Sequence, residues 1–352
     1  MLQVRLPSIA IGIALALIPA ATAPASTQVA PRYVVSVDSA HREIVITLGP
    51  YDVPADSGME DHMDMPLMTD VLSPIMTWPM RTMIRGYRLT IEDSAGHPLS
   101  RRLLHHYGVV QLDRRELVYP ALQNLIGGGA ETDDVILPST VGTPLEAGDR
   151  FAVYFMWKNR TGRPFHRVSL RIHLLWIAGN QQPRPTPVMP FWVDVNYHPG
   201  GSDTYDVPPG GDTRAYAFTL PVSGHLLVVG GHLHAYGSSM RVEDAETSQG
   251  IVRVTAHREP DGTVRHVSRK VFGFFGAGPH LIAGHRYLLV VSYDNPTTDT
   301  LRNIMGVLGG LFVPDDIAAW PPLDRTATLY IRGRELQSWE ARVTASRGTP
   351  DP

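Results

Sequence analysis

Apolar and polar side chains alternate in Tyr33-Val34-Val35-Ser36-Val37 and again in Glu43-Ile44-Val45-Ile46-Thr47. Runs of the same kind recur at Phe151 to Trp157, Val168 to Leu174, Tyr216 to Leu220, Leu226 to Val229, Ile251 to Thr255 and Tyr287 to Tyr293. A period of two is typical of strands, because successive side chains point to opposite faces of a sheet. Convincing helical periodicity is almost absent, and Gly, Pro and Asp separate the runs. The sequence therefore predicts an all-β protein built from antiparallel sandwiches.

The length of 352 residues suits two domains, each with its own core. The clearest boundary is the polar, Pro-rich stretch Gly179-Asn180-Gln181-Gln182-Pro183-Arg184-Pro185-Thr186-Pro187, which follows an apolar strand pattern. We expect one β-sandwich over residues 26–182, a linker over 183–189 and a second β-sandwich over 190–343. Residues 344–352 are short, polar and end in proline, which predicts a disordered tail.

The N-terminus has the pattern of a targeting segment. Arg5 precedes an apolar run from Ile9 to Ile18, and Ala23-Pro24-Ala25 has the small-x-small form of a signal-peptidase site. We expect cleavage after Ala25 and a secreted or periplasmic mature chain without a membrane anchor. The alternative is a retained anchor, which the short apolar core disfavours.

Charge and cysteine content exclude several classes of function. The chain has 31 Lys and Arg against 34 Asp and Glu, so a nucleic-acid partner is not expected. It has no cysteine, which excludes disulfides, thiolate metal sites and thiol nucleophiles. A metal site in this chain must use His, Met or carboxylate ligands.

The strongest candidate metal motif is His232-Leu233-His234, which follows the buried-strand pattern Leu226 to Val229. Residues i and i+2 of a strand share a face, so both imidazoles can reach one ion. The alternative is a pair of exposed histidines. Met305 lies far downstream and offers a soft thioether that favours Cu(I), although most methionines are core residues.

A second candidate is the adjacent pair His105-His106. Neighbours on a regular strand face opposite ways, which predicts one buried and one exposed histidine. Both can reach one metal only if the backbone is irregular there, as at a bulge or a strand start.

A third feature is a Met-rich segment over residues 59–83. It contains Met59, Met63, Met65 and Met68 with His62, and then Met76, Met80 and Met83. The first four lie among acidic residues, which suits either a Cu(I)-capturing loop or a surface loop with chance enrichment.

The motifs follow a recognisable order: His105-His106, Ile136-Leu137-Pro138, Phe151 to Trp157, His232-Leu233-His234 and Met305. This order resembles the copper type II ascorbate-dependent monooxygenases, which include peptidylglycine α-hydroxylating monooxygenase and dopamine β-monooxygenase. The resemblance runs from about His105 to Met305. It implies two jelly-roll-like sandwiches in tandem, with one copper ion in each.

By this resemblance, His232, His234 and Met305 hold the catalytic copper where oxygen and substrate meet. His105 and His106 hold an electron-entry copper, with Met156 where the family has a third histidine. Ascorbate or another one-electron donor would be the reductant, and an activated C–H bond of a small molecule would be hydroxylated. We expect a monomer. One alternative is a non-catalytic envelope protein that binds or handles copper on the same scaffold. Another is a sandwich that kept the fold, lost the metal and acts in adhesion or assembly.

The chain departs from the peptide-hydroxylating members at two substrate contacts. Gly230 stands where they carry an arginine for the substrate carboxylate, and Gly309 stands where they carry a tyrosine. Peptide amidation is therefore not implied, and the sequence does not identify the substrate.

Overall fold

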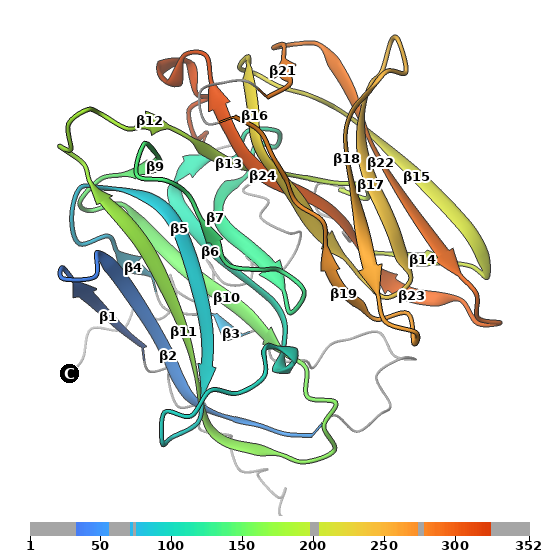
Figure 1. Ribbon diagram of the computed structural model, residues 1–352, viewed down its shortest axis with the longest axis horizontal. Helices are drawn as coiled ribbons and strands as arrows, with labels where there is room; N and C mark the ends of the chain where they lie inside the picture. Colours follow the sequence, from blue (N-terminus) through green and yellow to red (C-terminus); the bar gives the residue numbers. More distant parts are fainter. Residues whose placement is uncertain (1–32, 56–70, 73–74, 198–203, 274–277, 325–352) are drawn as a thin grey trace, which may run out of the picture. The chain divides into compact units, whose positions relative to one another are not determined.

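β-Strands provide nearly all the regular structure of this protein. The computed structural model describes residues 33–55, 71–72, 75–197, 204–273 and 278–324, and these contain no α-helix (Figure 1). Two short 3₁₀ turns, Arg101–Leu103 and Ile317–Ala319, are the helical segments found there. The described residues belong to one compact unit spanning Pro31–Pro352.

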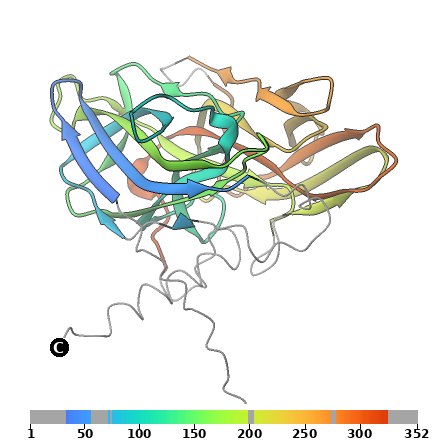
Figure 2. The same ribbon diagram turned by 90° about the horizontal axis from the view of Figure 1, so that it is seen from below.

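Residues up to Pro187 form two sheets. The strands of sheet 1 are β1 (Tyr33–Asp38), β2 (Glu43–Val53), β5 (Thr82–Glu92), β8 (Val135–Ile136), β9 (Val141–Leu145), β11 (Phe165–Ala178) and β12 (Thr186–Pro187). Their order is β1-β2-β11-β5-β9-β12, with β8 paired to β5. Figure 2 shows β1 and β2 as a blue hairpin at one edge.

Sheet 2 completes the first sandwich. Its strands are β3 (Val71–Leu72), β4 (Met76–Thr77), β6 (Leu104–Arg115), β7 (Leu122–Gly129) and β10 (Arg150–Trp157). Their order is β3-β10-β6-β7, with β4 paired to β10. Apolar residues from both sheets, such as Ile46, Leu89, Tyr107 and Phe155, form one buried cluster, so each sheet buries one face against the other.

The described residues from Met189 to 324 form the second sandwich. Sheet 3 contains β13 (Met189–Asp194), β16 (Gly224–Leu233), β20 (Lys270–Val271), β21 (His280–Leu281) and β24 (Gly306–Pro314). Sheet 4 contains β15 (Gly210–Thr219), β17 (Gly237–Asp244), β18 (Gly250–Arg258), β19 (Val264–Val267) and β22 (Arg286–Asn295). The strands β14 (Tyr205–Val207) and β23 (Leu301–Ile304) pair separately.

The strand orders of these sheets are β13-β24-β16-β20, with β21 paired to β16, and β15-β22-β17-β18-β19. Phe191, Val229, Met240 and Leu289 belong to the buried cluster of this sandwich. The all-β fold with two sandwiches in tandem, predicted from the alternating runs, is confirmed, and each of those runs lies within or overlaps a strand.

The faces of sheets 2 and 3 that do not contribute to these cores share a further apolar cluster. Val110 and Tyr154 from sheet 2 join Trp192, Met305 and Val307 from the second half of the chain. On β6 the members of this cluster alternate with Tyr107 and Val109, which belong to the first core. His106 lies in the same alternating set as Val110 and therefore faces the second sandwich.

The chain passes from sheet 1 to sheet 3 at Val188, which lies inside the stretch predicted as a linker. β12 pairs in parallel with β9, whereas β13 pairs with β24, and Val188 itself is buried. The Pro-rich segment is thus packed against the first sandwich. The two-domain division stays a prediction.

Several predictions lie outside the described residues: the signal peptide, its cleavage site after Ala25, the methionines at 59–68 and the tail at 344–352. Among the described residues, no helix has the length and apolar character needed to cross a membrane.

Candidate metal centre

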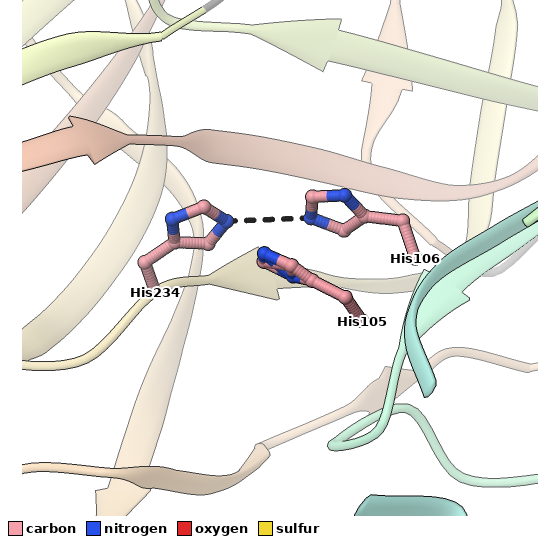
Figure 3. Close-up of side chains that lie close together, drawn as sticks. All are labelled: His105, His106 and His234. Carbon is pink, nitrogen blue, oxygen red and sulfur yellow. Dashed lines mark hydrogen bonds between the residues drawn. The ribbon is translucent and has the colours of Figure 1, made fainter. Parts of the chain in front are cut away.

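Four histidines from the two sandwiches meet in one cluster, which we call the histidine centre: His105, His106, His232 and His234. The Nε2 atom of His106 lies 3.0 Å from Nε2 of His232 and 3.3 Å from Nε2 of His234. One ligand nitrogen from each of His105, His106 and His234 lies within 4.8 Å of the others (Figure 3). From the sequence, the pair His105-His106 and the pair His232/His234 were each assigned to a separate copper ion, and their contact was not predicted.

A bulge at the start of β6 brings both neighbouring histidines to the centre. On β10, Met156 pairs with His106 but Trp157 pairs with Leu104, so His105 is the extra residue. The rings of His105 and His106 stack, with centroids 3.9 Å apart and an interplanar angle of 22°. The irregular backbone that the adjacent pair requires is therefore present.

The His-x-His pair lies at the end of β16, on the face of sheet 3 that turns away from the core of the second sandwich. Leu233 belongs to that core, so His232 and His234 share the opposite face. A Cβ on Gly231 would collide with the Val307 carbonyl and the end of the Met240 side chain. Only glycine lets β16 approach β24 this closely immediately before the pair.

The hydroxyl of Tyr293 fixes the position of His234. It accepts a hydrogen bond from the His234 backbone N–H at 3.0 Å and donates one to the Met305 carbonyl. Tyr293 is buried, so its hydroxyl is held by these two partners. It links the end of β16 to the segment between β23 and β24.

Glu131 orients His232, and sequence reasoning missed it. Its Oε1 accepts a hydrogen bond from Nδ1 of His232 at 2.5 Å, and both side chains are less than 10% exposed. This bond places the ring proton on Nδ1 and leaves the Nε2 lone pair directed at the centre. A carboxylate on the second nitrogen is the usual partner of a metal-binding histidine.

Glycine at position 129 makes room for Glu131, because a Cβ there would collide with the carboxylate. The signal for this residue was an acidic side chain just after Gly127-Gly128-Gly129. Since His232 is 101 residues away, nothing local pointed to their contact.

His234 is held in its neutral form. Burial lowers its pKa well below the usual range, and the neighbouring His232, His105 and Lys158 act in the same direction. A hydrogen bond with the backbone of Asn303 acts the other way, and Asn303 itself has a left-handed φ of 54°. A neutral imidazole has the free lone pair that a metal ion needs.

The spacing of these nitrogens fits ligands of one ion. Two imidazole nitrogens at about 2.0–2.1 Å from a tetrahedral ion lie about 3.3 Å apart. The observed separations of 3.0 and 3.3 Å between His106 and the other pair are close to this value. Imidazole ligands suit copper, zinc, iron and nickel.

Of the two methionines predicted as ligands, Met156 lies beside the centre, and Met305 is linked to it through its backbone carbonyl and Tyr293. Met156 is the cross-strand partner of His106, so their side chains share one face of sheet 2. Met305 is 3% exposed and belongs to the apolar cluster on that face. Their roles as ligands stay predictions. Met76 and Met83, by contrast, are buried core residues.

A second group of potential ligands lies on sheet 3: His225, His280 and Asp315. Nδ1 of His225 is 2.9 Å from the Gly278 carbonyl, and Nε2 of His280 is 2.8 Å from Asp315 Oδ2. His280 and Asp315 are largely exposed, and their ion pair accounts for their proximity.

Comparisons with known proteins do not identify a family for this chain. No protein-family model and no curated protein matches the chain. Among solved structures, it is similar to the major capsid protein P2 from bacteriophage PM2, at 9% identity over 76% of this chain and 98% of that one, with a TM-score of 0.34. It is also similar to PNGF-II, at 11% identity over 76% and 66%, with a TM-score of 0.35. Similarities this weak carry no argument about function.

Proposed function

We propose that this protein binds copper at the histidine centre and is a copper-dependent monooxygenase. It would hydroxylate an activated C–H bond of a small molecule with O2 and ascorbate or another one-electron donor. The convergence of the His106, His232 and His234 Nε2 atoms supports this proposal most directly.

Each residue of the centre has a distinct role in this proposal. His106, His232 and His234 hold the ion, and His105 stacks on His106 within reach of the same position. Glu131 keeps the Nε2 lone pair of His232 available. Copper would supply one-electron redox chemistry, and the thioethers of Met156 and Met305 would favour its reduced state.

A non-catalytic role in copper handling is the second candidate. The position of Met156 opposite His106 favours it, because a thioether beside imidazoles stabilises Cu(I) and opposes redox cycling. Under either proposal the chain would be exported as a monomer, to the periplasm or the medium.

Metal analysis combined with oxygen uptake tests these proposals. The purified chain is loaded with copper, its metal content is measured, and ascorbate-driven O2 consumption is followed. The nitrogen distances also suit N–H···N hydrogen bonds between the rings, so metal content is the deciding measurement. We expect bound copper in the parent and its loss in His106→Ala.

The control is His97→Ala, which removes an exposed histidine paired with Asp93. We expect copper content in this variant to equal that of the parent. Absence of copper from the parent would refute both candidates. Bound copper without O2 uptake driven by ascorbate or by other one-electron donors would leave the handling role and refute the monooxygenase.

A further inference from the structure

A cavity of about 180 Å³ borders the histidine centre, with His232 and Glu131 in its lining. Most of the other lining groups are apolar side chains from both sandwiches, among them Ile126, Leu137, Phe191 and Val228. Apolar cavities of about 150 Å³ bind molecules the size of benzene. A molecule of that size would lie beside the ring of His232.

Two glycines opposite each other in sheet 3 keep this cavity open. Gly230 on β16 is the cross-strand partner of Gly309 on β24, and both line the cavity. A Cβ on Gly230 would find only Arg269 Cγ, at 3.9 Å, and one on Gly309 only the Phe191 carbonyl oxygen, at 3.6 Å. Neither glycine has a positive φ.

Backbone packing therefore does not require glycine at these two positions. It does require glycine at their neighbours Gly231 and Gly310, where a Cβ would collide with backbone oxygens. The effect of glycine at 230 and 309 is to leave space that larger side chains would fill.

The polar groups of the lining suit a neutral ligand. Glu131 is paired with His232, and the two terminal nitrogens of Arg269 donate to the carbonyls of Asp134 and Asp133, both at 3.2 Å. Within the described residues, the Asn124 Oδ1 acceptor and the Trp192 Nε1 donor are buried without a hydrogen-bond partner. Both residues belong to the lining, so its uncharged polar character suits a ligand with one hydroxyl or amide better than a charged one.

We propose that this cavity binds a small, uncharged, mostly apolar molecule of about one aromatic ring with a single hydrogen-bonding group. Its identification as the substrate site rests on the proposed monooxygenase function. The binding itself does not require copper, so the two ideas can fail separately.

The test is binding of benzyl alcohol to the metal-free chain, measured by calorimetry or ligand-observed NMR, with benzoate as the charged counterpart. We expect saturable binding of benzyl alcohol and at least about tenfold weaker binding of benzoate. Equal or tighter binding of benzoate would refute the preference for a neutral ligand, and lack of saturable benzyl alcohol binding would refute the site.

Cavity-filling variants locate the site. Gly230→Leu and Gly309→Val should each weaken benzyl alcohol binding by about tenfold or more. The matched control is Gly250→Leu. Gly250 is a strand glycine like the other two, does not line the cavity, and has no atom within 4 Å of its Cβ position. If a folded filling variant bound the probe like the parent, the cavity would not be the binding site.

Copper content of the same samples separates the outcomes. Retained copper in the filling variants with lost probe binding supports a substrate site beside an intact centre. Copper binding by the parent without probe binding refutes this inference and leaves the proposed function standing. Probe binding without copper refutes the proposed function and leaves the cavity as a ligand site.

Discussion

Glu131→Gln is the most direct test of how the histidine centre is built. The substitution keeps the size of the side chain and an oxygen that can accept from Nδ1 of His232, but it removes the negative charge. The pair lies in a poorly hydrated environment, with 9% of the histidine and 8% of the glutamate side chain exposed. The charge is therefore weakly screened, and its hydrogen bond belongs to the stronger class.

Loss of such a partner typically lowers metal affinity by about 10- to 100-fold, which corresponds to about 1.4–2.7 kcal/mol. We expect Glu131→Gln to weaken copper binding within this range. Glu131→Leu should weaken it further, because it also removes the acceptor. Affinity would be measured at pH 7 by competition with a chromogenic Cu(I) chelator.

The chain provides a matched control in a second buried Glu–His pair. Oε2 of Glu43 lies 3.0 Å from Nδ1 of His173, with 10% and 18% of the side chains exposed, and Glu43 also binds Arg88. Glu43→Gln should lower the free energy of unfolding and leave copper affinity unchanged. If Glu131→Gln bound copper as tightly as Glu43→Gln does, the orienting role of Glu131 would be refuted.

Three further predictions concern the histidine centre, a buried carboxyl group and a close contact between two strands. Copper affinities of His106→Ala, His234→Ala and the double variant should show a coupling of at least about 0.5 kcal/mol, whereas two independent sites would give additive losses. Burial raises the pKa of Glu116 to about 8 from a usual value of 4.5, so the folded state keeps a proton that the unfolded state releases. As the pH rises from 4.5 to 8, the unfolding free energy of the parent should therefore fall by at most about 1.4 kcal/mol per pH unit. In urea titrations at pH 6 and 8, Glu116→Gln should lack this contribution to the fall. Gly231→Ala should lower the unfolding free energy by about 1–3 kcal/mol, because the new Cβ collides with the Val307 carbonyl. The control is the neighbouring variant Gly230→Ala, and equal urea midpoints for the two variants would contradict this prediction.

The sequence was sufficient to predict the strands and which side chains share a face. A period of two identifies a strand without knowledge of its partner, and it placed His232 and His234 on one face correctly. It also showed that His105 and His106 need an irregular backbone, which the bulge opposite Met156 provides.

Contacts between distant strands could not be predicted in this way. Alternation predicts that one of His105 and His106 points away from the core of the first sandwich, but it does not show what packs on that face. The contact of His106 with His232, 126 residues away, depends on how sheets 2 and 3 pack. Glu131 was missed for the same reason, since its partner comes from the other sandwich.

The packing of the two sandwiches therefore determines the geometry of the histidine centre. His105, His106 and His232 lie on strands, so their positions follow those of sheets 2 and 3 and not a local loop conformation. The apolar cluster of Val110, Trp192 and Val307 joins residues of both halves of the chain on the faces that carry these histidines. A shift of 1 Å between the sheets would alter the Nε2 separations of 3.0 and 3.3 Å by up to about a third of their length. Apolar side chains in this cluster thus help to set the spacing of the histidine nitrogens, although in the sequence they look like ordinary strand residues.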